Sequence, residues 1–494
     1  MRLHLRTFYA LSVSAVIAAM FLTGCSGGGE VPEAPADSMP SSASSSTEAP
    51  ATSESAPSAP SSESTSSSTA KPEKTDGIKW TYTKTGTSTA RLTGYDASGE
   101  KIPAGMVTLP SKVDGYTITE VAPGAFRGNS DITEIVFPAT ITKIESRAFF
   151  ECKNLKQVQF TKNLTQIGEQ AFENDGLAEL NFPQDAVTVG ARAFMGNKSL
   201  EQVTFKGKAT FGTSIFSQCS ALQEVVLDDE ITQITNYMFS DCSALKKIEL
   251  PKQLETIGQQ AFSGCKALSE ISIPESVNEI GSMAFYQCQS LYTIVLPKNI
   301  TEIKYSTFTG CTGLTTVKMQ GEVTSIANQA FSSCKSLHDI NLPDSVVNIG
   351  EKAFMNCTAL ESIEIPQKVT VIPDGTFSGC TSLRTVKLHP GLRTIGNRAF
   401  EQCKGLRKLA LPEGLTTISG QTFYNSNGLR YIYIPKSLTS IEHDAFSNCN
   451  NLSAVYYGGS ETSWNAINIA NGNISLISAK PYYNATASVL DTLI

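Results

Sequence analysis

Fifteen phenylalanines recur along this chain at an almost constant spacing, and this period limits what the chain can fold into. Twelve of the fourteen steps between them are 23 residues long and the other two are 22. A fixed period in this range predicts a solenoid, because one short unit cannot bury its own apolar face and must stack against its neighbours. The fifteen positions are Phe126, Phe149, Phe172, Phe194, Phe216, Phe239, Phe262, Phe285, Phe308, Phe331, Phe354, Phe377, Phe400, Phe423 and Phe446.

A single unit shows how each coil is built. Leu268, Ile271 and Ile273 follow an L-x-x-I-x-I spacing, which predicts a short strand with one buried face. Pro274 ends the pairing, because proline has no backbone N–H to donate. Gly281 then predicts a turn with positive φ before the next phenylalanine. We therefore expect each coil to give one strand, a turn and a return segment, with all strands in one parallel β-sheet.

Two copies of the unit carry a resemblance to a known family. Residues 257–262 read Ile-Gly-Gln-Gln-Ala-Phe, and residues 349–354 read Ile-Gly-Glu-Lys-Ala-Phe. With the residues that follow, they give I-G-x-x-A-F-x-x-C-x-x-L-x-x-I-x-L-P, which resembles the BspA-type leucine-rich repeat of bacterial surface proteins. The resemblance covers about residues 102–457 and implies a leucine-rich repeat superhelix of about 15 coils. The cysteine departs from the general repeat template, because it precedes the strand instead of following it.

Both ends of the repeat region also resemble that family. Leu109-Pro110 looks like its opening repeat, and Tyr457-Gly458-Gly459 followed by Trp464 looks like its closing segment. A solenoid needs such covers for the exposed edge and core of its terminal coils, while the last ten residues are expected to fray. The predicted divisions are 76–123 for a small N-terminal β cap, 124–457 for the repeats, and 458–494 for the C-terminal cap and tail.

Eleven of the twelve cysteines lie three residues after one of the fifteen recurring phenylalanines, which we call the ladder phenylalanines. The four coils without one have Asn129, Asp175, Asn197 and Ser426 there, so the position takes a small residue and needs no bridge partner. We interpret the set as a ladder of buried thiols. Disulfides between stacked coils are the alternative, and a metal site fits a line of thiols less well. The eleven are Cys152, Cys219, Cys242, Cys265, Cys288, Cys311, Cys334, Cys357, Cys380, Cys403 and Cys449.

The twelfth cysteine, Cys25, follows a signal sequence. Arg2 and Arg6 precede a fifteen-residue apolar run, which is short for a membrane span and suits a signal core. Leu22-Thr23-Gly24-Cys25 looks like a bacterial lipobox, which implies cleavage of residues 1–24 and lipidation of Cys25. An ordinary signal peptide with an incidental cysteine is the alternative. Residues 25–75 are rich in Ser, Pro, Ala, Thr and Glu, and predict a disordered tether.

Composition excludes several functions. The net charge of −7 argues against nucleic acid as a partner, because such proteins need a basic face. The chain has no phosphate-binding loop and no H-E-x-x-H motif, and no nucleophile recurs with a base and an orienting group. We therefore expect no enzyme activity, no cofactor and no metal.

A ligand is expected to contact the outward residues of the strands. Aromatic side chains are enriched at binding hot spots, and in these columns they gather in the last coils, as Tyr431, Tyr433 and Tyr456. These three form the candidate ligand-binding site, although the closing segment could instead cover them. Glu364 and Lys387 are expected to pair across adjacent strands.

The sequence thus predicts a lipid-anchored protein on the outer face of the bacterial membrane, reaching through the cell wall on its tether. The resemblance implies adhesion, with a protein or glycan ligand on host or neighbouring cell surfaces and no membrane contact beyond the lipid anchor. A structural scaffold of the envelope without a dedicated ligand remains the alternative, and an enzyme without a recognisable motif is a further one.

Overall fold

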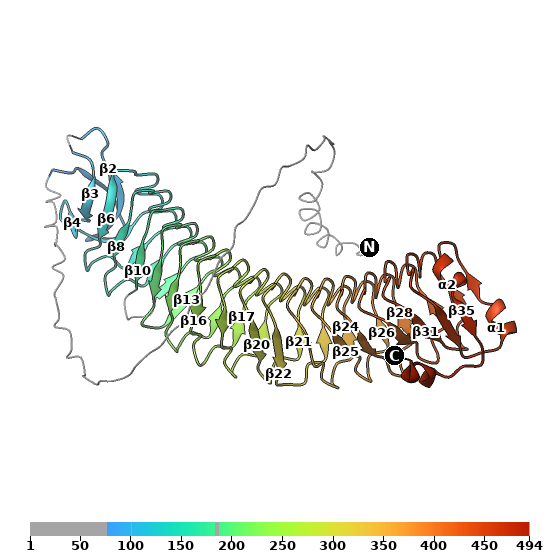
Figure 1. Ribbon diagram of the computed structural model, residues 1–494. Coiled ribbons are helices and arrows are strands. Elements are labelled where there is room, and N and C mark those ends of the chain that lie inside the picture. Colours follow the sequence, from blue (N-terminus) through green and yellow to red (C-terminus); the bar gives the residue numbers. More distant parts are fainter. Residues whose placement is uncertain (1–76, 100, 183–186, 494) are drawn as a thin grey trace, which may run out of the picture. The chain divides into compact units, whose positions relative to one another are not determined.

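The repeats wind into a solenoid of about 16 turns with parallel strands and little helix, which confirms the predicted fold (Figure 1). The computed structural model describes residues 77–99, 101–182 and 187–493. The predicted signal peptide 1–24, the lipidation site Cys25 and the tether 25–75 lie outside the described residues. The solenoid has one turn more than the ladder phenylalanines indicated, because a strand of the N-terminal cap pairs with the first repeat.

The predicted strands form a first line, which only the coil of Phe331 leaves without a strand among the described residues. The line is divided into separate sheets of two to four strands, and within each sheet neighbours pair in parallel and in register, so that residues one repeat apart lie side by side. The line runs through β3 (Gly105–Thr108), β6 (Ile132–Val136), β8 (Gln157–Gln159), β10 (Glu179–Asn181), β12 (Gln202–Thr204), β14 (Glu224–Val226), β16 (Lys247–Ile248), β18 (Glu270–Ile271), β20 (Thr293–Leu296), β22 (Thr316–Met319), β25 (Ser362–Glu364), β27 (Thr385–Lys387), β29 (Lys408–Ala410), β31 (Tyr431–Ile434), β33 (Ala454–Tyr457) and β35 (Lys480–Tyr482).

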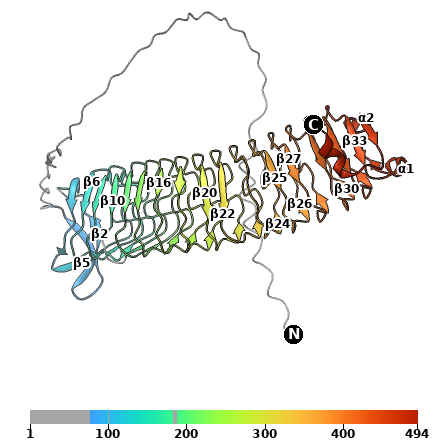
Figure 2. The same ribbon diagram turned by 60° about the horizontal axis from the view of Figure 1, so that its bottom comes forward.

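The return segment carries a second line of short parallel strands, where the sequence predicted a single sheet. Figure 2 shows the two lines along opposite edges of the row of coils. Most of these short strands end in a buried aliphatic residue such as Ile280, whose burial fixes the pairing. The second line runs through β5 (Tyr116–Val121), β7 (Lys143–Ile144), β9 (Gln166–Ile167), β11 (Val187–Val189), β13 (Ala209–Phe211), β15 (Gln233–Ile234), β17 (Thr256–Ile257), β19 (Glu279–Ile280), β21 (Glu302–Ile303), β23 (Ser325–Ile326), β24 (Asn348–Ile349), β26 (Val371–Ile372), β28 (Thr394–Ile395), β30 (Thr417–Ile418), β32 (Ser440–Ile441) and β34 (Asn468–Ile469).

The ladder phenylalanines form one column of stacked rings in the core. Ring centroids of successive coils lie 5.0 to 5.9 Å apart, with interplanar angles of 2° to 24°. Phe149, Phe262 and Phe354 are fully buried. Aromatic pairs contribute about 0.5–1.5 kcal/mol beyond the burial of their area. The column therefore couples each coil to the next through its core.

Around each ladder phenylalanine the backbone makes a third set of contacts between coils, which we call the turn line. It comprises the residues from two before to two after each ladder phenylalanine. At Phe262, the N–H groups of Gln260, Phe262 and Gly264 donate to carbonyls of the next coil at 2.8 to 3.0 Å. The outer two have positive φ angles, 53° for Gln260 and 75° for Gly264, and the equivalent pair of every ladder phenylalanine does so too. The turn line therefore fixes the backbone conformation at these positions, whichever side chains they carry.

The glycine that follows the second strand has a different role from the predicted one. Gly281 does not have a positive φ. A Cβ atom there would lie 2.5 Å from the backbone nitrogen of Gln259 in the preceding coil. Gly168 has the same environment, with a backbone nitrogen at 2.5 Å. Glycine is needed here because two backbones approach each other closely.

The N-terminal cap covers the first coil with a small sheet. β1 (Trp80–Lys84) and β2 (Thr89–Tyr95) form an antiparallel hairpin. β2 pairs in parallel with β5, and β4 (Lys112–Val113) pairs with β5 in the antiparallel direction. Trp80 and Tyr95 both pack against the ring of Phe126, with centroids 6.3 Å away. They shield the open end of the aromatic column from water.

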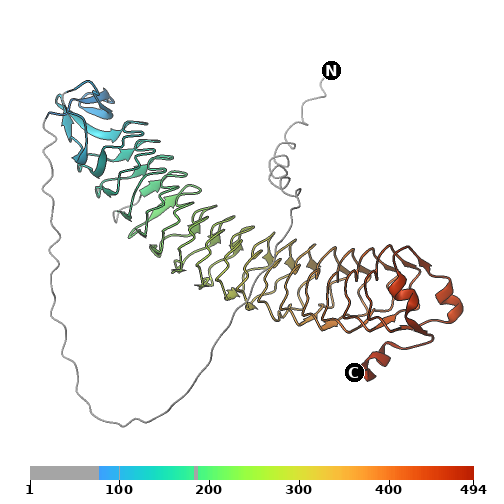
Figure 3. The same cartoon turned by 45° about the horizontal axis from the view of Figure 1, so that its top comes forward.

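The C-terminal cap closes the other end with two short helices, α1 (Glu461–Asn465) and α2 (Ile474–Ser478), as Figure 3 shows. Leu476 is buried, and Trp464 packs edge-on against Tyr457 at 5.2 Å. Asn473 ends the turn line, because its Oδ1 accepts the N–H of Phe446 at 2.9 Å in place of a further coil. The last residues do not fray as predicted, since η1 (Ala487–Thr492) packs on β29 and β31.

Candidate functional site

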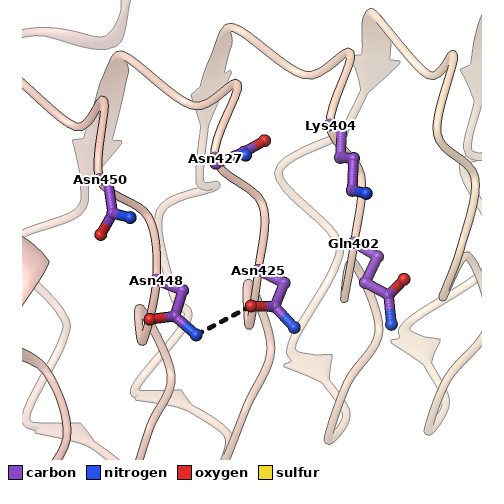
Figure 4. A pocket seen from close by; sticks show the side chains of 6 residues that line it. All are labelled: Gln402, Lys404, Asn425, Asn427, Asn448 and Asn450. Atoms are coloured by element: carbon purple, nitrogen blue, oxygen red, sulfur yellow. Dashed lines mark hydrogen bonds between the residues drawn. The ribbon is translucent and has the colours of Figure 1, made fainter. Parts of the chain in front are cut away.

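A shallow groove crosses three neighbouring coils near the C-terminal end of the solenoid (Figure 4). It encloses about 400 Å³. Five of its side chains are amides and one is a lysine, so neither a carboxylate nor an aromatic ring lines it. The six residues are Gln402, Lys404, Asn425, Asn427, Asn448 and Asn450, which we call the amide groove.

The turn line positions the first row of these amides. Gln402, Asn425 and Asn448 each follow a ladder phenylalanine by two residues, with φ angles of 57°, 59° and 59°. Asparagine accepts this left-handed conformation more readily than most residues. The N–H of Gln402 donates to the Tyr424 carbonyl at 2.8 Å, and that of Asn425 donates to the Ser447 carbonyl at 3.0 Å. The three side chains therefore start from one straight column of backbone.

The second row, Lys404, Asn427 and Asn450, lies two residues further along the same coils. Within the first row, the Asn448 amide donates from Nδ2 to Oδ1 of Asn425 at 2.9 Å (Figure 4). Each amide has two donor hydrogens and an acceptor oxygen, so several remain to bind a ligand. Hydroxyl and peptide groups match this mixture of donors and acceptors. The groove contains no nucleophile with a neighbouring base, and it suits binding rather than catalysis.

Sequence reasoning missed the amide groove because it looked for a site on the strands. The signal was present in two stretches, Asn425-Ser426-Asn427 and Asn448-Cys449-Asn450, which occupy the same phase of the repeat. Only the geometry of the turn line shows that these residues stand side by side and face solvent.

The three tyrosines predicted to bind a ligand do not form an exposed platform. Tyr433 is 4% exposed, and its hydroxyl donates to Oε1 of Glu413 at 2.6 Å. Burial, and then the hydrogen bond to Glu413, raise the pKa of Tyr433 well above its usual value. Tyr431 and Tyr456 are half-buried. The ring of Tyr456 stacks on Tyr482 at 5.0 Å, so its face is already covered.

The C-terminal tail covers part of the surface on which these tyrosines were expected to be exposed. η1 packs on β31, which carries Tyr431 and Tyr433, and on the neighbouring strand β29. Lys408 on β29 holds the tail, because its Nζ donates to the carbonyls of Leu490 at 2.9 Å and Leu493 at 2.8 Å. Part of the outward face of the first strand line is thus an internal contact.

The ladder cysteines lie in the core, and each donates from Sγ to the carbonyl of the ladder phenylalanine in the coil before it, at 3.0 to 3.3 Å. All eleven are free thiols. Burial raises the pKa of the Cys219 and Cys311 thiols to about 12, and it also raises the pKa of Cys242, Cys265 and Cys288. Neutral, inaccessible thiols of this kind have structural roles.

The part of the chain that the structure describes holds neither a metal-binding cluster nor a membrane-spanning helix. There, no group of three or more His, Cys, Asp or Glu side chains could hold a metal ion. In the same residues no helix has the length and apolar character to cross a membrane.

Two solved structures of bacterial leucine-rich repeat proteins are similar to this chain. A leucine-rich repeat protein from Bacteroides ovatus is 26% identical, with 77% of this chain and 93% of that chain covered and a TM-score of 0.54. A leucine rich cell surface protein from Faecalibacterium prausnitzii is also 26% identical, with 79% and 96% covered and a TM-score of 0.43. No curated protein matches the chain.

The repeats also match a family model directly. The model described as a BspA type leucine rich repeat region of six copies matches residues 119–246, 232–361 and 347–474. These matches span more than half of the chain and include every coil that lines the amide groove. The protein therefore belongs to the BspA-type leucine-rich repeat family.

Proposed function

We propose that this protein is a lipid-anchored cell-surface binding protein that presents its solenoid to a macromolecular partner. The amide groove is the observation that carries the proposal, because it is an exposed polar surface built on backbone positions that the turn line fixes. Its family typically contains non-catalytic binding proteins, which agrees with a groove that lacks catalytic groups. The partner is a protein or a glycan on a host cell or a neighbouring cell.

The location rests on the N-terminal sequence. The apolar run that ends in Leu22-Thr23-Gly24-Cys25 supports export and lipidation of Cys25. Bacterial lipoproteins carry at least two acyl chains, which suffices for firm membrane attachment. Residues 25–75 would then act as the tether that carries the solenoid through the wall.

Replacing the anchor tests the location. In cells that express the full chain, Cys25→Ser is expected to release the protein into the medium or leave it unprocessed, because the acylated thiol is lost. Membrane fractionation and intact-mass measurement report both effects. Normal cleavage with unchanged, detergent-sensitive membrane retention would show that another feature holds the protein.

Arrays of host matrix proteins and glycans test the binding role. The full chain is expected to bind a subset of them, and Asn425→Ala with Asn448→Ala is expected to weaken that binding by tenfold or more, about 1.4 kcal/mol. The matched control is Asn174→Ala with Asn356→Ala, because these asparagines hold the same turn-line position with φ angles of 61° and 59°. Equal losses in both double variants would exclude the groove as the site.

A scaffold of the envelope is the second candidate function. It is favoured by the outward charges of the first strand line, several of which pair with each other. Lys387 lies 3.0 Å from Glu364, and Lys247 lies 3.7 Å from Glu270. A surface that satisfies its own charges needs no ligand. If the full chain binds nothing on the arrays at micromolar concentration, the scaffold is the better description.

A further inference from the structure

Three arginines stand at one position of three successive coils, beside the amide groove. Arg384, Arg407 and Arg430 each follow a ladder phenylalanine by seven residues, just before a strand of the first line, and all three are exposed. The N–H of Arg430 donates to the carbonyl of Arg407 at 2.8 Å, so these two are direct neighbours across the strands. Neighbouring strands are about 4.8 Å apart. The guanidinium groups are therefore presented as a row.

Two of the three arginines have no carboxylate partner among the described residues. Arg384 has a carboxylate of Glu361 at 3.7 Å, but within the described part of the chain neither Arg407 nor Arg430 pairs with a carboxylate. Like charges on directly opposite residues of neighbouring strands destabilise a sheet. Elsewhere the first strand line avoids this cost by placing opposite charges side by side, as at Lys387 and Glu364. The arginine row departs from that arrangement.

The surrounding segment is strongly basic, although the whole chain is acidic. Residues 381–431 contain eight Lys or Arg and two Asp or Glu, a difference of +6, while the chain carries −7. Both carboxylates of the segment are engaged. Glu401 accepts a hydrogen bond from the Ser378 hydroxyl at 3.0 Å, and Glu413 accepts that of Tyr433. Two cations of the segment, Arg384 and Lys387, pair with Glu361 and Glu364 of the preceding coil. Arg407 and Arg430 have no such partner among the described residues, so the positive charge at their position is available to attract an anion.

The arginine row and the amide groove share two coils, those that follow Phe400 and Phe423. Arg407 follows Lys404 of the groove by three residues, and Arg430 follows Asn427 by three. In these two coils, a ligand that lies along the row would meet a guanidinium at each step on one side and groove side chains on the other. Guanidinium groups bind carboxylate, sulfate and phosphate through paired hydrogen bonds, whereas amides bind hydroxyl groups. A chain of sugars with regularly spaced anionic groups has both features.

We propose that Arg407 and Arg430, together with Lys404 and the amide groove, bind a linear anionic polysaccharide that lies across the coils. This proposal rests on the binding role proposed above and names the class of its ligand. Arginine supplies the attraction to the anionic groups, and the amides distinguish a hydroxyl-rich sugar chain from other polyanions. The absence of a lining aromatic ring means that recognition depends on charge and hydrogen bonds, so binding should weaken as salt rises.

Titration of the full chain with defined polymers tests the proposal. The probes are a heparin-derived sulfated oligosaccharide, an oligogalacturonate with carboxylates and a phosphorylated dextran, with unmodified dextran as the neutral polymer and oligothymidylate as the nucleic acid. At least one anionic saccharide polymer is expected to bind, and comparison of the three identifies the preferred anion. Unmodified dextran and oligothymidylate are expected to bind at least tenfold more weakly.

Arg407→Gln with Arg430→Gln is expected to weaken that binding by tenfold or more and to reduce its salt dependence. The matched control is Lys156→Gln with Lys246→Gln, because both lysines are exposed, occupy the same repeat position in other coils and remove the same charge. The control is expected to change binding less than twofold. Equal losses in the two variants would overturn the proposal, as would equal binding of oligothymidylate, or no binding of any anionic polymer. If a different array ligand still depends on Asn425 and Asn448, the binding role stands and only the polysaccharide assignment fails.

Discussion

Asp175 provides a sharp test of how the core of the solenoid is hydrogen-bonded. It occupies the ladder position that eleven coils fill with cysteine, and its side chain is buried. Its Oδ1 accepts the N–H of Cys152 at 2.8 Å, but its buried Oδ2 has no hydrogen-bond partner among the described residues. Other residues at this position donate to the carbonyl of the preceding ladder phenylalanine, as Asn197 does at 2.7 Å. An ionised carboxylate has no hydrogen to donate.

Burial raises the pKa of Asp175 well above its usual value. In the unfolded chain an aspartate titrates near pH ~3.9, so the folded state holds the proton over a range where the unfolded state has released it. The contribution to stability is complete below that pH and is lost as the pH rises through the folded pKa. The slope reaches at most about 1.4 kcal/mol per pH unit. At neutral pH an unsatisfied buried group costs about 1–3 kcal/mol.

Asp175→Asn is therefore expected to stabilise this coil at pH 7 by about 1–3 kcal/mol and to remove its local pH dependence. Solenoids open locally, so hydrogen exchange of peptides spanning residues 149–180 between pH 4 and pH 8 is the appropriate measurement, with intrinsic rates corrected for pH. Asp241→Asn is the control, because Asp241 is exposed in a coil of the same design. If both variants keep the wild-type pH dependence, Asp175 is not the titrating group and the reasoning is wrong.

Two other predictions concern the thiols and the tail. Thiol titration of the native protein is expected to find few reactive groups, because burial keeps the ladder cysteines neutral and inaccessible, and the denatured protein should expose all eleven; mass mapping of five disulfides would contradict this. Lys408→Ala is expected to raise hydrogen exchange in residues 485–493 without changing it around Phe262, because the two bonds from Nζ to the tail carbonyls are lost. Unchanged exchange in the tail would mean that packing of Leu490 alone holds it.

The core of this fold could be predicted from the sequence because every coil buries the same apolar positions against its neighbours. The spacing of Phe262 and its equivalents specified the solenoid, and the offset of the cysteines placed them in the core beside the rings. The second line of strands was missed because its members are mostly two residues long, too short for an alternating pattern to stand out. The glycine at position 281 was predicted to serve a turn with positive φ, whereas it is needed for a close approach between two coils. The sequence of a single repeat does not reveal such an approach.

Contacts between distant parts of the chain limit how well the candidate binding site could be predicted from the sequence. Tyr433 looked exposed in its column because the repeat says nothing of a tail that returns to Lys408 from 82 residues further along. The amide groove was hidden for the opposite reason. Its positions belong to turns, where a sequence pattern predicts a change of direction but not which side chains will align. Aligned positions become visible only when residues one repeat apart are compared with one another.

That comparison explains why the fold alone does not reveal the ligand of such a protein. The turn line and the two strand lines fix the backbone of every coil, so a side chain at an exposed position can change without affecting the packing. Seven residues after the ladder phenylalanine, or at the equivalent position, the coils carry Thr133, Lys156, Ala178, Glu201, Gln223, Lys246, Ser269, Tyr292, Thr315, His338, Glu361, Arg384, Arg407, Arg430 and Ser453. Arginine occurs in this column only as one uninterrupted run, and the run adjoins the amide groove. A run of like charges opposes folding of the coils that carry it, so an anionic partner that neutralises it would stabilise those coils as it binds.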